Sequence, residues 1–360
     1  MINTTVHFLH KYFLWLLLLG YAMAVIAPGT GLFLHDLSIS RITISQSNFL
    51  NITPSLMMLA LLLLNAGLGI KVQEIKNLWS QPRLAIIGFF INSIVPVLLI
   101  FLFRTTLGHW HNQDELQNLL TGLALIVAMP IAGSSTAWSQ NANGNLSLSL
   151  GLVLLSTIAS PIITPAILHT FSFITTGDYS EDLQELAQQG SNIFMCFTVV
   201  MPSILGVILH FLFGETKIAT IKPILKLINF IVLLLLNYSN AATSLPQAFA
   251  KPDMDFLGFI LIVTTLMCIV AFGSGWIISK IFKTNKADMA ALMFGLGMSN
   301  NGAGLVLASA TLADHQTVLL PIIFYTLIQQ IMAAVVDKIF FKNESQIQID
   351  SSYKEGRLPI

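Results

Sequence analysis

The sequence predicts an all-α integral membrane protein of ten transmembrane helices, arranged as two inverted repeats of five helices each. Three observations predict this class. Of the 360 residues, 55% are hydrophobic and 9% are charged, and the mean hydropathy is +0.78; soluble domains carry roughly a quarter charged residues. The apolar residues form ten segments, most of them close to the length of about 20 residues that a membrane helix needs. Two of these segments, at corresponding places in the two halves, are interrupted by small and amide residues.

The ten apolar segments are joined by short connections. The first is too long for a signal peptide and lacks a clear cleavage site, so we expect it to be retained. Residues 1–173 would hold the first five-helix repeat and residues 174–342 the second, and the polar tail 343–360 is predicted to be cytoplasmic and disordered. The segments span residues 12–33, 54–70, 84–103, 117–142, 145–170, 190–213, 223–246, 254–279, 289–312 and 317–341.

The charges in the connections alternate. The loop after the fifth segment is acidic, with Asp178, Glu181, Asp182 and Glu185. By the positive-inside rule both termini are cytoplasmic and the acidic loop lies outside, in a multi-pass protein of the inner or plasma membrane. Because five is odd, the second half would enter the membrane in the opposite sense to the first. Basic residues follow the second, sixth, eighth and tenth segments: Lys71, Lys76 and Arg83; Lys217, Lys222 and Lys226; Lys280, Lys283 and Lys286; Lys338, Lys342, Lys354 and Arg357.

The two interrupted segments predict a binding site. They read PIAGSSTAWSQNANGN (130–145) and MFGLGMSNNGAGLVLAS (293–309), and neither contains a charged side chain. Glycine and asparagine weaken a helix, and a broken backbone survives at membrane depth only where protein or a watery cavity satisfies it. The second half-helices would begin near 133–136 and 300–302, with their positive dipole ends toward the centre. Such ends suit an anion without any arginine.

Several other classes of function are disfavoured. The formal net charge is zero and no basic patch appears, which argues against nucleic acid as a partner. Cys196 and Cys268 lie in apolar segments without metal-ligand spacing and are interpreted as packing residues. We find no paired membrane aspartates and no HExxH motif, so the sequence does not predict an enzyme, and it predicts no cofactor apart from a sodium ion in one of the hypotheses below.

Four stretches resemble the bile acid:sodium symporter family, and the resemblance covers nearly the whole chain. They are NANGNLSLSLGLVLLSTIASPIITPAILHTF (141–171), GLGMSNNG (295–302), NAGLGI (65–70) and PRLAIIGFFINSIVP (82–96). The resemblance implies a panel of helices one, two, six and seven, and a core of helices three to five and eight to ten in which the discontinuous helices four and nine cross. It also implies alternating-access transport of an organic anion, from bile acids and sulfated steroids to small carboxylates, usually with sodium. We expect a monomer among membrane lipids.

The candidate substrate-binding residues lie at the two breaks and on the last segment. Those at the starts of the second half-helices are Gly133, Ser134, Asn300 and Asn301, and the resemblance adds Gln329 and Gln330. Adjacent helical residues differ by about 100° in direction, so at most one of the two glutamines points straight into a cavity. The alternative is that these amides bond neighbouring helices. A polar cluster at 237–240 would lie on the panel side.

The resemblance also implies a sodium site from which this sequence departs. Its candidate ligands are Ser135, Thr136, Ser149, Asn92, Met298 and Ser299. The family's glutamate is Gly295 here, and its glutamine is Ser299. Sodium at the midplane needs several oxygens and usually a negative charge. Sodium coupling, proton coupling, an uncoupled carrier and a ligand-binding sensor of the same fold therefore stay open. His169 and His210 lie at segment ends, away from the breaks.

Overall fold

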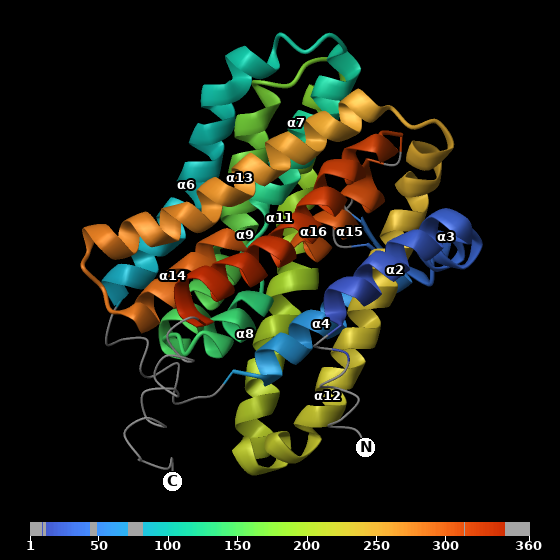
Figure 1. Ribbon diagram of the computed structural model, residues 1–360. Coiled ribbons are helices and arrows are strands. Elements are labelled where there is room, and N and C mark those ends of the chain that lie inside the picture. The colour runs from blue at the N-terminus through green and yellow to red at the C-terminus, as the bar shows by residue number, and fades with distance from the viewer. Residues whose placement is uncertain (1–8, 10–11, 44–48, 71–81, 313, 343–360) are drawn as a thin grey trace.

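The computed structural model describes residue 9 and residues 12–43, 49–70, 82–312 and 314–342 (Figure 1). Most of these residues are helical, and the predicted tail 343–360 lies outside them. The helices are α2 (Phe13–Ile26), α3 (Pro28–Asp36), α4 (Pro54–Leu68), α6 (Pro82–Leu107), α7 (Gln113–Ala128), α8 (Ser134–Asn141), α9 (Leu146–Ser172), α10 (Asp178–Glu185), α11 (Ser191–Phe194), α12 (Met201–Ala250), α13 (Met254–Ile281), α14 (Lys286–Gly297), α15 (Asn301–Thr311) and α16 (Leu319–Val336). Wider or tighter turns extend them at Leu186–Gly190 (η1), Met195–Val200 (η2), Gln316–Val318 (η3) and Asp337–Lys342 (η4).

The helices are those of a multi-pass membrane protein. Within the described ranges, five helices are long and apolar enough to cross a membrane, or six if the bent pair α2 and α3 counts as one span. Each of the ten predicted apolar segments is mostly helical: the sixth runs from α11 through η2 into the start of α12, the seventh lies within α12, and the others each correspond to one helix or to two consecutive helices. The number of segments that cross the membrane, and the inverted relation of the two halves, stay predictions.

The expected all-α class holds apart from one short hairpin. Strands β1 (Ser40–Thr43) and β2 (Phe49–Ile52) pair antiparallel, with Ser40 opposite Ile52. Their sequences, SRIT and FLNI, contain the β-branched and aromatic residues that favour strands. The hairpin was not expected, because each strand has only four residues and neither shows a clear apolar alternation.

The first predicted segment is bent rather than straight. Helices α2 and α3 meet at an angle of 90° across Ala27. Pro28 begins α3, and proline cannot donate the backbone hydrogen bond that would continue α2. Tyr238 of α12 holds the bend, because its hydroxyl donates to the Ala27 carbonyl at 2.6 Å and accepts from the Gly31 amide at 3.2 Å.

Helix α12 consists of two arms that meet at Gly214. This glycine has φ 76° and ψ 160°, in the left-handed half of the backbone map that glycine tolerates best. The chain reverses there, and the two arms of α12 join at the lower end of the helix bundle in Figure 1. The first arm (201–213) and the second arm (215–250) contain most of the predicted sixth segment and all of the seventh.

The helices pack as two groups. We call α2, α3, α4 and α12 the panel, and α6 to α9 with α13 to α16 the core; they occupy the lower right and the upper left of Figure 1. In the panel, the backbones of α4 and the first arm touch: a Cβ on Gly67 would lie 2.1 Å from the Ser203 carbonyl oxygen, and one on Gly206 would lie 2.1 Å from that of Leu64. Small residues allow such close helix contacts in membranes.

Candidate functional site

The two breaks cross each other inside the core. Helix α7 ends at Ala128 and α8 begins at Ser134, while α14 ends at Gly297 and α15 begins at Asn301. The connecting residues pair as an antiparallel bridge between Ile131 and Ser299. The Ala132 amide donates to the Met298 carbonyl at 2.9 Å, and the Asn300 amide donates to the Pro130 carbonyl at 2.8 Å. Each broken helix thus satisfies the backbone of the other, which permits both breaks in an apolar interior.

Side chains of α9 and α16 support this crossing. Ser156 of α9 accepts from the Ile131 amide at 3.1 Å, and Thr164 donates to the Ala128 carbonyl at 2.6 Å. Gln329 of α16 bonds the backbone of Ser299 with both ends of its amide: Oε1 accepts from the amide at 3.2 Å, and Nε2 donates to the carbonyl at 3.3 Å. The crossing is therefore fixed from two sides.

The adjacent glutamines face different partners, as the helical geometry required. Gln329 is buried and its amide is occupied by the crossing. Gln330 is partly exposed, and its Oε1 accepts from Trp138 Nε1 of α8 at 3.3 Å. The side-chain amide of Gln329 therefore bonds neighbouring protein segments, which was the alternative to ligand binding. The Nε2 of Gln330 can still donate a hydrogen bond to another group.

The starts of α8 and α15 carry polar side chains that have no hydrogen-bond partner in the described part of the chain. Helix α8 begins without a side-chain cap, whereas Asn300 caps α15 by accepting from the Ala303 amide at 3.4 Å. Both polar atoms of the Asn301 amide and the hydroxyl of Ser135 are buried, with no hydrogen bond to any described residue. A buried polar group without a partner costs about 1–3 kcal/mol. These groups therefore favour a polar ligand or water at this point.

These helix starts lie against the panel. A Cβ on Gly133 would be 3.6 Å from Ala66 of α4, and one on Gly302 would be 3.6 Å from Leu236 in the second arm of α12. Gly133 and Ser134 are exposed, and Asn300 is partly exposed. The predicted residues of the two breaks therefore gather at the boundary between the panel and the core.

The predicted sodium ligands have the following contacts. Ser149 donates to the Thr136 hydroxyl at 3.2 Å, beside the buried Ser135, so three of the hydroxyls lie together. The carbonyls of Met298 and Ser299 already accept hydrogen bonds from the Ala132 amide and from Gln329. Asn92 and Ser93 line a cleft together with the end of α7 and the two residues after it (Val127 to Pro130) and with Ser156 and Ser160, and none of the other predicted ligands lines that cleft.

A leucine lies beside Gly295, the position where the resemblance implies a carboxylate. A Cβ on Gly295 would lie 2.9 Å from Cδ1 of Leu152, which comes from α9. Leu152 is fully buried, so it fills the space that a longer side chain at 295 would need. Within the part of the chain that the structure describes, no three His, Cys, Asp or Glu side chains gather as a metal site would require. Sequence reasoning missed Leu152, because no motif reports which side chain fills a given space.

Asp288, His210 and His169 have partners outside the crossing. Asp288, at the start of α14, accepts from Asn145 Nδ2 at 2.7 Å, which ties α14 to the start of α9. His210 Nδ1 lies 2.7 Å from the Leu68 carbonyl at the end of α4. His169 packs edge-on against Phe173, with ring centroids 4.9 Å apart.

The acidic loop carries a histidine–carboxylate pair. Asp182 of α10 lies 3.6 Å from Nε2 of His315, which follows α15. Burial raises the pKa of Asp182 above its usual value, and the neighbouring acids Asp178, Glu185 and Asp314 raise it further, while His315 acts in the opposite direction. Burial is the largest of these effects, so the ion pair does not offset it completely.

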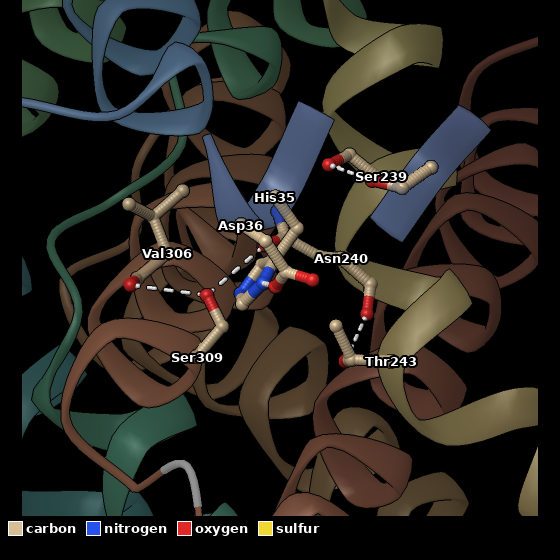
Figure 2. A network of polar contacts seen from close by, with 8 residues as sticks. His35, Asp36, Ser239, Asn240, Thr243, Val306 and Ser309 are labelled. Atoms are coloured by element: carbon tan, nitrogen blue, oxygen red, sulfur yellow. Dashed lines mark hydrogen bonds and ion pairs between the residues drawn. The ribbon is translucent and has the colours of Figure 1, made fainter. Parts of the chain in front are cut away.

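A polar network joins the panel to the core (Figure 2). Ser309 of α15 donates to Asn240 Oδ1 in the second arm of α12 at 3.1 Å. The Asn240 Nδ2 donates to the Leu236 carbonyl at 2.9 Å, and Thr243 donates to the Asn240 carbonyl at 2.7 Å. The sequence indicated the cluster at 237–240, but it gave no sign that Ser309 was its partner.

Two broken helices that cross in a membrane bundle and present uncharged polar groups at their helix starts are typical of secondary transporters. A family model described as the SBF-like CPA transporter family matches residues 11–341, and the chain belongs to this family. The predicted resemblance to the bile acid:sodium symporters is thereby confirmed. The family consists of transporters, which indicates that the protein is not an enzyme.

Characterised and uncharacterised relatives agree with this assignment. The chain is 27% identical over 272 residues to the uncharacterised protein YbaS of Bacillus subtilis, which covers 75% of this chain and 82% of YbaS. It is 22% identical over 254 residues to the uncharacterised sodium-dependent transporter YocS of the same species, covering 70% and 72%. It is 24% identical over 300 residues to the mouse sodium/bile acid cotransporter 7, covering 79% and 82%.

Proposed function

We propose that this protein is a secondary transporter that carries a small organic anion across a membrane by alternating access. The observation that carries the proposal is the pair of helix starts at the panel–core boundary, with the side-chain amide of Asn301 buried and without a partner among the described residues. Helix N-termini attract negative charge, and no charged side chain lies in either break to repel it. The names of the relatives, which include a bile acid cotransporter, support an organic anion as the class of substrate.

The proposed site consists of Gly133 and Ser134 at the start of α8, Asn300 and Asn301 at the start of α15, and Gln330 on α16. Gln329 contributes by holding the backbone of Ser299 in place. The panel would rock against the core and expose this site to each side in turn. The proposal includes ten membrane crossings, with two inverted repeats at residues 1–173 and 174–342 and cytoplasmic termini, which the distribution of basic residues supports.

Sodium coupling is a separate part of the proposal. The hydroxyls of Ser135, Thr136 and Ser149 could hold a monovalent cation, and the relative YocS is described as sodium-dependent. Against this stands Leu152, an apolar side chain whose Cδ1 would lie 2.9 Å from a Cβ at position 295, where the resemblance implies a carboxylate. That contact favours the second candidate function, a sodium-independent carrier or a ligand-binding membrane protein of the same fold.

The test measures the thermal stability of the purified protein in sodium and in potassium at equal ionic strength, with bile acids, sulfated steroids and small carboxylates as probes. A ligand of the folded state raises stability by mass action. We expect at least one anion to stabilise the wild type, and the same anion to enter proteoliposomes. If the anion raises the melting temperature more in sodium than in potassium, sodium coupling is supported. If the rise is equal in both salts, the second candidate function is supported.

The variant Asn301→Leu separates binding from folding. Because both polar atoms of this amide lack partners, replacement by leucine should leave the protein as stable as the wild type or more so, and should abolish stabilisation by the anion. The matched control is Ser191→Ala, which removes another buried hydroxyl without a described partner, in α11 rather than at the breaks. If the anion stabilises Asn301→Leu as strongly as the wild type, the site lies elsewhere.

A further inference from the structure

One buried hydrogen bond connects the two groups of helices beyond the proposed ligand site. Asn240 in the second arm of α12 has 0% of its surface exposed, and its Oδ1 accepts from Ser309 of α15 at 3.1 Å (Figure 2). Ser309 lies seven residues after Gly302, so the bond is about 10 Å further along α15 than the proposed site. Leu236, one turn before Asn240, lies beside Gly302 itself. The second arm therefore runs along α15 from the ligand site to this bond.

A second contact lies at the same end of the boundary. Gln247 Nε2 of the second arm donates to Gln316 Oε1 at 3.4 Å, in the turn that follows α15. Gln247 is two helical turns beyond Asn240, on the same face of the helix. Both contacts join the panel to the core, so the described conformation is closed at this end.

The serine is suited to a bond that opens and closes. Besides Asn240, its hydroxyl has a second acceptor, the Val306 carbonyl of its own helix, at 3.3 Å. When the panel moves away, the hydroxyl hydrogen can turn to this carbonyl, so the core keeps a satisfied donor. The Asn240 Oδ1 loses its partner but gains access to water as the end opens. The bond therefore holds the closed state without a large penalty for opening, since membrane hydrogen bonds of this kind are weak.

We propose that Asn240 and Ser309 form a latch that holds the panel against the core at this end and sets how often the proposed ligand site opens there. The proposal rests on the proposed function, because it assigns the latch to one gate of alternating access. In the predicted topology, the C-terminal end of the second arm lies on the external side of the membrane. The latch therefore closes the path between the ligand site and that side. The two side chains hold the panel in position and do not contact the ligand.

Hydrogen exchange measured by mass spectrometry on the full-length protein tests the latch without any ligand. In Ser309→Ala, the backbone amides of residues 240–250 and 306–318 should exchange about 3- to 20-fold faster than in the wild type. This range corresponds to the free energy of one hydrogen bond between membrane helices. The matched control is Ser274→Ala. That serine is also buried and also donates to a carbonyl three residues back, at 2.7 Å, but it lies on α13 within the core. We expect no acceleration of these amides in the control.

A double-mutant cycle gives the second measurement. If the two side chains act as one latch, Ser309→Ala should have no further effect on exchange in the Asn240→Ala background. Unchanged exchange in Ser309→Ala, or equal acceleration by Ser274→Ala, overturns the latch. These outcomes can be told apart from a failure of the proposed function. In that case no anion stabilises the wild type or enters proteoliposomes, while Ser309→Ala still accelerates hydrogen exchange.

Discussion

Replacing Gln329 tests whether this side chain holds the crossing or touches the substrate. Its amide bonds both the N–H and the carbonyl of Ser299, and the side chain is buried. In Gln329→Leu the carbonyl keeps one partner, because the backbone N–H of Asn301 also donates to it at 2.9 Å. The N–H keeps no described partner. The cost is therefore that of one buried unpaired donor, about 1–3 kcal/mol in the free energy of unfolding.

Reversible unfolding in mixed micelles measures this free energy, with Gln330→Leu as the matched control. Gln330 is the next residue on α16, is partly exposed and loses only its contact with Trp138, so we expect a cost below about 1 kcal/mol. The control should weaken anion binding more than it weakens the fold. If Gln329→Leu is as stable as the control, the crossing does not depend on this amide. If it then also loses stabilisation by the anion, Gln329 contacts the ligand directly.

Three further substitutions follow from the packing and the charges. Gly206→Ala should destabilise the panel by about 1–3 kcal/mol in the same assay, because the new Cβ would meet a backbone carbonyl of α4 at 2.1 Å, whereas Gly20→Ala, with nothing within 4 Å, should not. Asp182→Asn should raise the melting temperature at pH 7 and lose this advantage as the pH falls toward about 3. A carboxyl whose folded-state pKa is raised costs stability above that pKa and nothing once both states are protonated; a pH-independent difference would contradict this. Gly295→Glu alone should destabilise the protein, because Leu152 occupies the space, but combined with Leu152→Ala it should create stabilisation by sodium over potassium. Equal melting temperatures of the double variant in the two salts would remove the support for a cation site there.

The sequence predicted the two breaks because local composition reports them. Glycine, serine and asparagine in apolar surroundings weaken a helix wherever the chain goes, so the ends of α7 and α14 were visible without any tertiary information. The antiparallel bridge between Ile131 and Ser299 was not visible, since it joins segments from the two halves and has no local signature. The same limit explains why Asn240 was recognised as polar but not matched with Ser309.

The sequence also could not predict which way particular side chains point or which side chain fills a given space in the core. Helical geometry required Gln329 and Gln330 to diverge, but it could not say which one turns to the crossing. The resemblance supplied six oxygen-bearing positions for sodium, and the structure places Asn92 in a separate cleft from the others. That Leu152 occupies the space beside Gly295 depends on how α9 packs against α14, which periodicity does not encode.

The bridge at the crossing also bears on how the chain is made. During synthesis, the connection between α7 and α8 reaches the membrane long before its partner, which lies half a chain later, between α14 and α15. At about 5–20 residues per second, the first connection waits on the order of ten seconds with its Ala132 amide and Pro130 carbonyl unpaired. A nascent first half must therefore rely on water, on the insertion machinery or on a looser arrangement of α7 and α8 until the second half arrives. Arrested chains that end before residue 298 should accordingly expose this connection to reagents that the finished protein excludes.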